Sequence, residues 1–183
     1  MELRMTKVAD NLPNRRSMLA AAVVTGAAVV SAGRAQADIH PTPGVEFALE
    51  LLVELAPPQE VGATPYGVRT RIPIVGGTFV GPRIKGKVVS GGADWQLHRA
   101  DGSTVIEADY MIQADDGTLI NINNRGIVSG KPGSPDMYLR TTPVFEAPIG
   151  PHDWMNKAVF VGTVEGVPNR ASPTVCVRVF KVT

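Results

Sequence analysis

Three ionisable side chains in the middle of the chain could move protons without a metal or a cofactor. They are Tyr110, Asp94 and Glu107, and proton transfer by positioned side chains of this kind is general acid–base catalysis. A guanidinium, from Arg125 or Arg140, could stabilise the negative charge that develops in such a reaction. Isomerisation, cyclisation or dehydration of a substrate could proceed with these side chains alone. A cofactor-independent acid–base enzyme is therefore one interpretation of these residues.

A second interpretation is a site that binds a small molecule. Indole and phenol rings offer apolar area with one donor each, an amide donates and accepts hydrogen bonds, and a guanidinium forks onto a carboxylate. The residues predicted to bind ligand on these grounds are Trp95, Tyr110, Asn124, Arg125, Arg140, Trp154 and Asn156. They suit a small apolar or aromatic oxygenated molecule. We favour this binding function over the enzyme, and a barrel filled by side chains with a structural role is the third alternative.

Other chemistries are poorly supported by the sequence. The run 81–87 has the spacing of a phosphate-binding loop, but Val88 stands where the metal-binding hydroxyl belongs and no helix is predicted to follow. His40, His98 and His152 are scattered, and Cys176 is the only cysteine, so neither a zinc site nor an intrachain disulfide is expected. The sequence has no basic patch with interleaved aromatic residues, so nucleic acid is not an expected partner. The sequence predicts no cofactor and no metal.

The amino-terminal segment has the features of an export signal. Arg15 and Arg16 precede a mildly apolar run, residues 17–33, and Arg34 lies just before the small residues of Ala35-Gln36-Ala37. Adjacent arginines before such a run are typical of twin-arginine signals. An ordinary secretory signal and an uncleaved anchor are the alternatives, although the run is short for a membrane-spanning helix. We predict a signal peptide over residues 1–37, and a periplasmic or secreted protein that begins near Asp38.

The remaining residues, 38–183, have the size of one domain. They carry 13 lysines and arginines against 15 aspartates and glutamates, a net charge of −2. A chain of this length buries enough surface to fold without a disulfide or a metal. After cleavage of the signal, no segment is expected to associate with a membrane. The expected partner is a small-molecule ligand, and the sequence leaves the oligomeric state open.

Glycine, proline and Asp-Gly interrupt short alternating runs about every ten residues, a pattern typical of antiparallel β structure. Strands are predicted over residues 47–55, 66–74, 83–89, 93–99, 104–114, 119–128, 137–146, 158–164 and 174–182. One helical turn is predicted near residues 152–156. Because no long helix covers a sheet face, the strands must form a sandwich or a barrel. We predict a single all-β domain, an antiparallel barrel of about 8 to 10 strands, since closure removes exposed edges.

The two Asp-Gly turns predict how the central strands pair. A two-residue turn at Asp101-Gly102 places Leu97 opposite Ile106, Trp95 opposite Ala108 and Asp94 opposite Asp109. A three-residue loop ending at Gly117 places Ile112 opposite Ile120, Tyr110 opposite Ile122, Ala108 opposite Asn124 and Glu107 opposite Arg125. Trp95, Leu97, Ile106, Tyr110, Ile112, Ile120 and Ile122 then share one buried face. Asp94 and Asp109 face each other on the other face, either as two solvated carboxylates near Arg125 or as a coupled pair with one raised pKa.

Several runs of this sequence match a known pattern in order and spacing. They include Gly91-Gly92-Ala93-Asp94-Trp95-Gln96, residues 72–82, Asp116-Gly117-Thr118-Leu119-Ile120, Asn124-Arg125-Gly126, residues 138–146 with Arg140-Thr141-Thr142-Pro143-Val144-Phe145-Glu146, and residues 154–162. With these runs the chain resembles uncharacterised-protein family 0311, also described as domain of unknown function 3237. The resemblance covers nearly all of residues 38–183. It implies a compact antiparallel β-barrel and no agreed activity.

Overall fold

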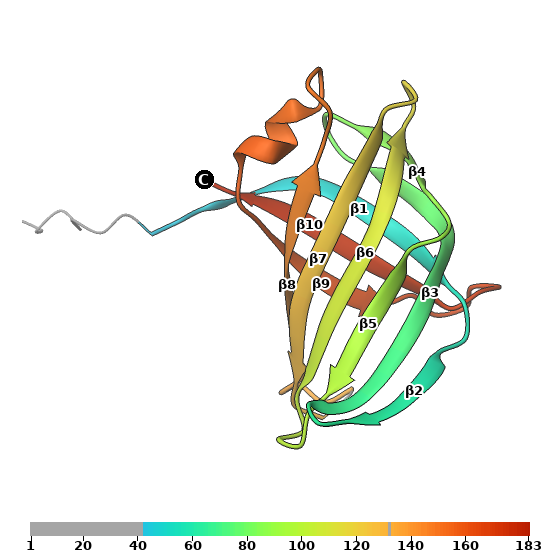
Figure 1. The fold of residues 1–183 in the computed structure, drawn as a ribbon. Helices are drawn as coiled ribbons and strands as arrows, with labels where there is room; N and C mark the ends of the chain where they lie inside the picture. The colour runs from blue at the N-terminus through green and yellow to red at the C-terminus, as the bar shows by residue number, and fades with distance from the viewer. Residues whose placement is uncertain (1–41, 132) are drawn as a thin grey trace, which may run out of the picture. The chain divides into compact units, whose positions relative to one another are not determined.

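The computed structural model describes residues 42–131 and 133–183, and the predicted signal peptide lies outside these residues. Over the described residues the chain forms strands and one 3-10 turn (Figure 1). The elements are β1 (Val45–Leu55), β2 (Gln59–Thr64), β3 (Gly67–Val80), β4 (Lys85–Val88), β5 (Ala93–His98), β6 (Thr104–Ala114), β7 (Leu119–Ser129), β8 (Tyr138–Glu146), η1 (Asp153–Lys157), β9 (Phe160–Gly166) and β10 (Thr174–Val182). The all-β class and the single helical turn are confirmed. Among the described residues, no helix has the length and apolarity needed to cross a membrane.

The strands close into an antiparallel barrel. The hydrogen-bonded order runs β1, β10, β9, β8, β7, β6, β4, β3, and the pairing of β1 with β3 completes the circle. β5 continues the path of β4 between β3 and β6, and β2 pairs only with the outer end of β3. The predicted barrel is therefore confirmed as an eight-stranded closed ring with two extra strands. Closure leaves β2 as the strand with an unpaired edge among the described residues.

The hairpin between β6 and β7 has the predicted register. The confirmed partners are Ile112 with Ile120, Tyr110 with Ile122, Ala108 with Asn124 and Glu107 with Arg125. The N–H of Ala114 donates to the carbonyl of Thr118 at 2.9 Å, which leaves three residues in the loop. The last of them, Gly117, has a φ of 89°, which glycine adopts without strain. Pairing apolar residues across this hairpin thus identified the correct loop.

The predicted register of the β5–β6 hairpin is wrong by one residue. Asp94 pairs with Ala108, Trp95 with Glu107, Gln96 with Ile106 and Leu97 with Val105. The N–H of Arg99 donates to the carbonyl of Ser103 at 2.9 Å, so this loop also holds three residues instead of two. A shift of one residue exchanges the two faces of a strand. The side chains of Trp95 and Leu97 therefore lie outside the barrel, and those of Asp94 and Gln96 lie inside.

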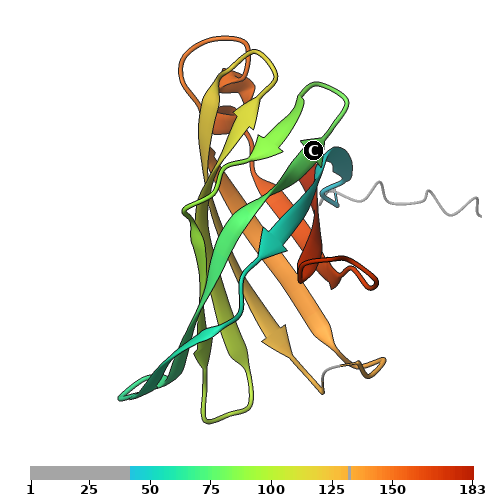
Figure 2. The same ribbon diagram turned by 90° about the vertical axis from the view of Figure 1, so that its right-hand side faces the viewer.

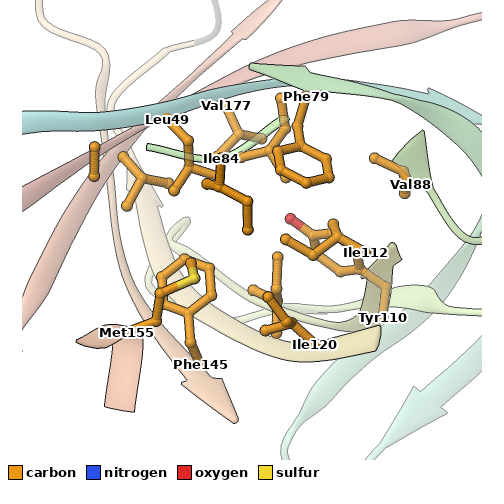
Figure 3. Close-up of a cluster of buried hydrophobic side chains, with 14 of the residues drawn as sticks. Leu49, Phe79, Ile84, Val88, Tyr110, Ile112, Ile120, Phe145, Met155 and Val177 are labelled. Carbon is orange, nitrogen blue, oxygen red and sulfur yellow. The ribbon is translucent and has the colours of Figure 1, made fainter. Parts of the chain in front are cut away.

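Apolar side chains fill one half of the barrel, the half that η1 covers (Figures 1 and 3). Ile112, Ile120 and Leu49 have no exposed surface, and Met155 of η1 is 1% exposed. The rings of Phe145 and Phe160 pack edge to face with centroids 5.0 Å apart. Further buried members of this cluster are Leu51, Phe79, Ile84, Val88, Ile122 and Val179. This half provides the apolar burial that stabilises the fold.

The wall between β8 and β9 is the shortest ladder in the ring. Its register comprises only Arg140 with Thr163 and Thr141 with Gly162, whereas β6 and β7 pair over ten positions. We call this two-pair ladder the β8–β9 seam. The β2–β3 and β5–β6 hairpins lie at the end of the barrel away from η1, which we call the open end (Figure 2). The ring is closed at the seam by few hydrogen bonds.

Candidate functional site

The other half of the barrel is hollow. A cavity of about 630 Å³ extends from the apolar cluster towards the open end. Its apolar lining residues are Val53, Leu55, Ile72, Ile74, Ile106, Ala108, Val128, Met137, Leu139, Val164, Val175 and Val177. The polar residues that border it are Asp94, Gln96, Tyr110, Asn124, Arg140, Thr163 and Glu165. A mostly apolar cavity with a few polar groups is the common form of a small-molecule site.

Asp94 lies on the cavity wall between two apolar cross-strand neighbours, Ile72 of β3 and Ala108 of β6. Its carboxylate accepts hydrogen bonds from Gln96 Nε2 at 2.7 Å and from the backbone N–H of Glu107 at 3.2 Å. Burial raises the pKa of Asp94, and the two hydrogen bonds offset only part of that rise. Asp94 is therefore a carboxyl group that holds its proton more tightly than an exposed aspartate does.

Tyr110 and Asn124 lie where the hollow half meets the filled half. Each residue is only 4% exposed, and the hydroxyl of Tyr110 points into the barrel interior (Figure 3). Burial, and secondarily the charge of Asp94, raise the pKa of Tyr110, so its hydroxyl stays protonated at neutral pH. Asn124 Oδ1 is buried and accepts no hydrogen bond from the described residues. Leaving such an atom unpaired costs about 1–3 kcal/mol, which a donor on a bound molecule would offset.

Arg140 belongs to the outer face of β8, between Leu139 and the buried Thr141, and only borders the cavity. Its side chain is exposed, its Nη1 donates to the carbonyl of Leu139 at 2.8 Å, and its Cζ lies 5.4 Å from the centre of the Tyr138 ring. No carboxylate of the described residues pairs with it, and the nearby Glu165 pairs with Arg178 at 3.1 Å. Arg140 could therefore contact a negatively charged group of a ligand only at the entrance.

Three predicted site residues lie on the outer surface of the barrel. Trp95 is 40% exposed, with Arg71 Cζ 5.8 Å from its ring centre. Glu107 pairs with Trp95 across β5 and β6, and Arg125 pairs with Glu107 across β6 and β7. The β5 register turns Trp95 outward, and Glu107 and Arg125 belong to the outer face of their own strands. None of the three lines the cavity.

The predicted pairing of Asp94 with Asp109 is wrong for the same reason, so the two carboxylates neither couple nor lie together on the outer face. Asp109 pairs with Ala93, is exposed, and accepts a hydrogen bond of 3.4 Å from Asn123 Nδ2 on the outer face. The wall of the barrel separates it from Asp94. The raised pKa of Asp94 comes from burial, not from a second carboxylate.

Trp154 and Asn156 lie at the closed end of the barrel. The Trp154 ring packs against Phe160 with centroids 6.2 Å apart and lies 4.3 Å from Arg83 Cζ. Asn156 Oδ1 accepts the N–H of Ala147 and its Nδ2 donates to the carbonyl of Ala147, both at 2.8 Å. The two residues attach η1 to the barrel and do not line the cavity. The structure thus brings together Asp94, Tyr110 and Asn124, with Arg140 at the rim.

The sequence reasoning missed Gln96, which orients Asp94, and the apolar side chains that shape the cavity. Gln96 follows Asp94 by two positions, so the two share a face of β5. That spacing was visible in the sequence, but the predicted register placed the pair outside. Within the described residues, no three His, Cys, Asp or Glu side chains come together in a way that would hold a metal ion.

Comparison with known proteins gives the family. Residues 43–182 match the family model described as protein of unknown function (DUF3237). The chain belongs to the DUF3237 family. A UPF0311 protein of Rhodopseudomonas palustris strain TIE-1 is 31% identical over 135 residues, which cover 67% of this chain and 88% of that protein. The family resemblance inferred from the sequence is confirmed.

Solved structures share the DUF3237 barrel. A conserved protein of unknown function from Rhodopseudomonas palustris superposes with a TM-score of 0.71 at 30% identity, covering 79% of this chain and all of that one. An enzyme from Penicillium herquei superposes with a TM-score of 0.61 at 21% identity, covering 79% of this chain and 98% of that one. The second likeness shows a shared fold alone.

Proposed function

We propose that this DUF3237 protein binds a small, largely apolar molecule in the hollow half of its barrel. The observation that carries the proposal is the cavity of about 630 Å³ with apolar walls, in which Asn124 Oδ1 is buried without a partner. A volume of this size lies within the range of ligand sites, roughly 300–1,000 Å³. The cavity also argues against a barrel that side chains fill throughout. An aromatic or alicyclic molecule with one or more oxygen atoms fits both the walls and the polar groups.

The test is mass spectrometry of small molecules carried through native purification, followed by titration of the compound found. Ala108 lies between Asp94 and Asn124 on the inner face, opposite both of them. Ala108→Leu should fill that space and weaken binding at least tenfold. Trp95→Ala, on the outer face, is the matched control and should bind as the wild type does. Equal binding by Ala108→Leu and the wild type would place the ligand outside the cavity.

A second candidate function is acid–base catalysis in the same cavity, and the raised pKa of Asp94 favours it. A carboxyl group whose pKa is raised by burial can give a proton to a bound substrate more readily than an exposed, fully ionised one, and can take it back. The Penicillium herquei enzyme supports this candidate only by analogy of fold. Turnover of the bound compound decides between the two functions: a catalyst should lose about 100-fold or more in kcat with Asp94→Asn, and a binding protein should show no turnover to lose.

A further inference from the structure

The deep part of the cavity offers hydrogen-bond acceptors without a neighbouring cation. The carboxylate of Asp94 receives donors only from Gln96 and from the backbone of Glu107, and its cross-strand neighbours are apolar. Asn124 Oδ1 is a second acceptor, and it has no partner among the described residues. The Tyr110 hydroxyl can act in either sense. A ligand that reaches this depth therefore meets two acceptors that its own donors can satisfy, beside the Tyr110 hydroxyl and the Asn124 amide, which can also donate.

Positive charge and further donors lie at the entrance. Arg140 is exposed at the rim. His98, two positions beyond Gln96 on the same face of β5, is held at the open end by Thr104 Oγ1 at 2.9 Å and Thr70 Oγ1 at 3.4 Å. The guanidinium of Arg140 is thus the positive charge that borders the cavity, and it lies apart from the acceptors Asp94 and Asn124 Oδ1 inside.

A carboxylate, an ammonium group and a hydroxyl of a ligand would differ in how well the deep end of the cavity accommodates them. A carboxylate at the deep end would give up its hydration among apolar walls beside another acidic group, Asp94, and no cation of the described residues lies there to compensate it. An ammonium group would give up its hydration among apolar walls, and the single carboxyl group of Asp94, already hydrogen-bonded to Gln96 and to the backbone of Glu107, compensates this poorly. A neutral hydroxyl donates to either acceptor without bringing a charge into the cavity.

We propose, building on the proposed binding function, that the cavity selects neutral ligands that enter with a hydroxyl group leading, and that this hydroxyl donates to Asp94 or Asn124. An apolar ring system behind the hydroxyl lies against the valine, leucine and isoleucine side chains of the wall. Any acidic group of the ligand remains at the entrance, beside Arg140. The ligand class is therefore an alcohol or a phenol rather than a carboxylic acid or an amine.

A matched series of naphthalenes tests this polarity. The probes are 2-methylnaphthalene, naphthalene-2-methanol, 2-naphthoate and 2-naphthylmethylamine, titrated at pH 7 into the full domain with detection by probe fluorescence. The alcohol should bind at least tenfold more tightly than each of the other three. In Asn124→Leu and Asp94→Leu its advantage over 2-methylnaphthalene should fall at least fivefold, while 2-methylnaphthalene binds as well as before. Trp95→Ala is the control and should keep the wild-type order.

The outcomes separate this inference from the proposed function. If all four probes bind with equal affinity and Ala108→Leu weakens them all, the cavity binds ligands but the selection for hydroxyls is wrong. If 2-naphthoate binds most tightly and Arg140→Ala removes that preference, the ligand is an acid recognised at the rim, and the inference is overturned. If the amine binds most tightly, the site prefers cationic ligands and the inference fails as well. If no probe binds and no compound is carried through purification, the binding function itself is contradicted.

Discussion

Two residues in the hollow half of the barrel lower the stability of the folded protein. Asp94 places a carboxyl group among apolar neighbours, and Asn124 buries an acceptor without a partner. In the filled half, by contrast, side chains such as Ile112 and Ile120 are fully buried and apolar. Polar groups retained at a cost to stability are typical of functional sites. Stability and binding should therefore respond in opposite directions to substitutions in the hollow half.

Asp94→Asn should raise the melting temperature by about 3 °C at pH 7 and leave it unchanged near pH 3, since about 1 kcal/mol corresponds to a shift of this size. Because the folded pKa of Asp94 lies above its unfolded value, its protonated form favours the fold below the unfolded pKa of 3.8. That contribution is lost as the pH rises through the folded pKa. Asparagine carries no charge to bury, and its oxygen can still accept a hydrogen bond.

The measurement is thermal unfolding of both proteins from pH 3 to pH 8. Other ionisable groups line the cavity or its rim: Tyr110 on β6, His98 on β5, Arg140 on β8 and Glu165 on β9. These groups are present in both proteins, so subtracting the melting temperature of the wild type from that of the variant at each pH removes their contribution. A difference that stays constant with pH, or a variant that is less stable at pH 7, would show that burial does not raise the pKa of Asp94.

At the level of elements, the two hairpin loops around β6 are alike. In both, an aspartate precedes a glycine, and the aspartate Oδ1 accepts the N–H of the residue that follows the glycine. That residue is Ser103 in one loop and Thr118 in the other, and both distances are 2.9 Å. The shared Asp-Gly-Ser/Thr sequence was the signal that both loops hold three residues. The β6–β7 register was predictable because only one loop length pairs apolar residues with each other. The β5–β6 register was not, because the apolar Trp95 and Leu97 fit an inner face better than Asp94 and Gln96 do.

The η1 turn and its attachment belong to the same scale. The side-chain amide of Asn156 makes two hydrogen bonds with the backbone of Ala147, as a residue of a neighbouring strand would do. Asn156→Ala should destabilise the protein by about 2 kcal/mol through the loss of both bonds. Ligand affinity should stay within twofold of wild type, because the residue does not line the cavity. Urea denaturation and titration of the same preparations check both expectations, and a loss of affinity without a loss of stability would return Asn156 to the binding site.

For the whole molecule, the chain length, the turn residues and the alternating runs were sufficient to predict a closed antiparallel barrel. They were not sufficient to predict which half is hollow. That depends on side chains from β1, β3, β5 to β10 meeting across the interior, and local patterns do not encode such distant contacts. The edge strand β2 was missed because Gln59, Glu60 and Gly62 lack the apolar alternation of a half-buried strand. Family membership is shown, whereas the ligand remains a proposal.

We also propose that the protein works in the periplasm or outside the cell, exported through the twin-arginine pathway. Replacement of Arg15 and Arg16 by lysine should leave the uncleaved precursor in the cytoplasm, because the pathway reads adjacent arginines and not charge alone. Cell fractionation with immunoblotting measures the outcome. Arg4→Lys, which preserves the pair, serves as the control. Undiminished export of the double variant would exclude the twin-arginine route.

The short β8–β9 seam has a consequence for exchange with solvent. A ladder of two residue pairs opens locally at a lower free-energy cost than a ladder of ten. We expect the backbone amides of β9 that bond to β8 to exchange hydrogen for deuterium at least tenfold faster than those between β6 and β7. Leu139 and Val164 line the cavity on either side of the seam, so a ligand bound as proposed should slow that exchange. The seam would then act as the hinge of the barrel, and its opening rate would limit how fast a ligand leaves.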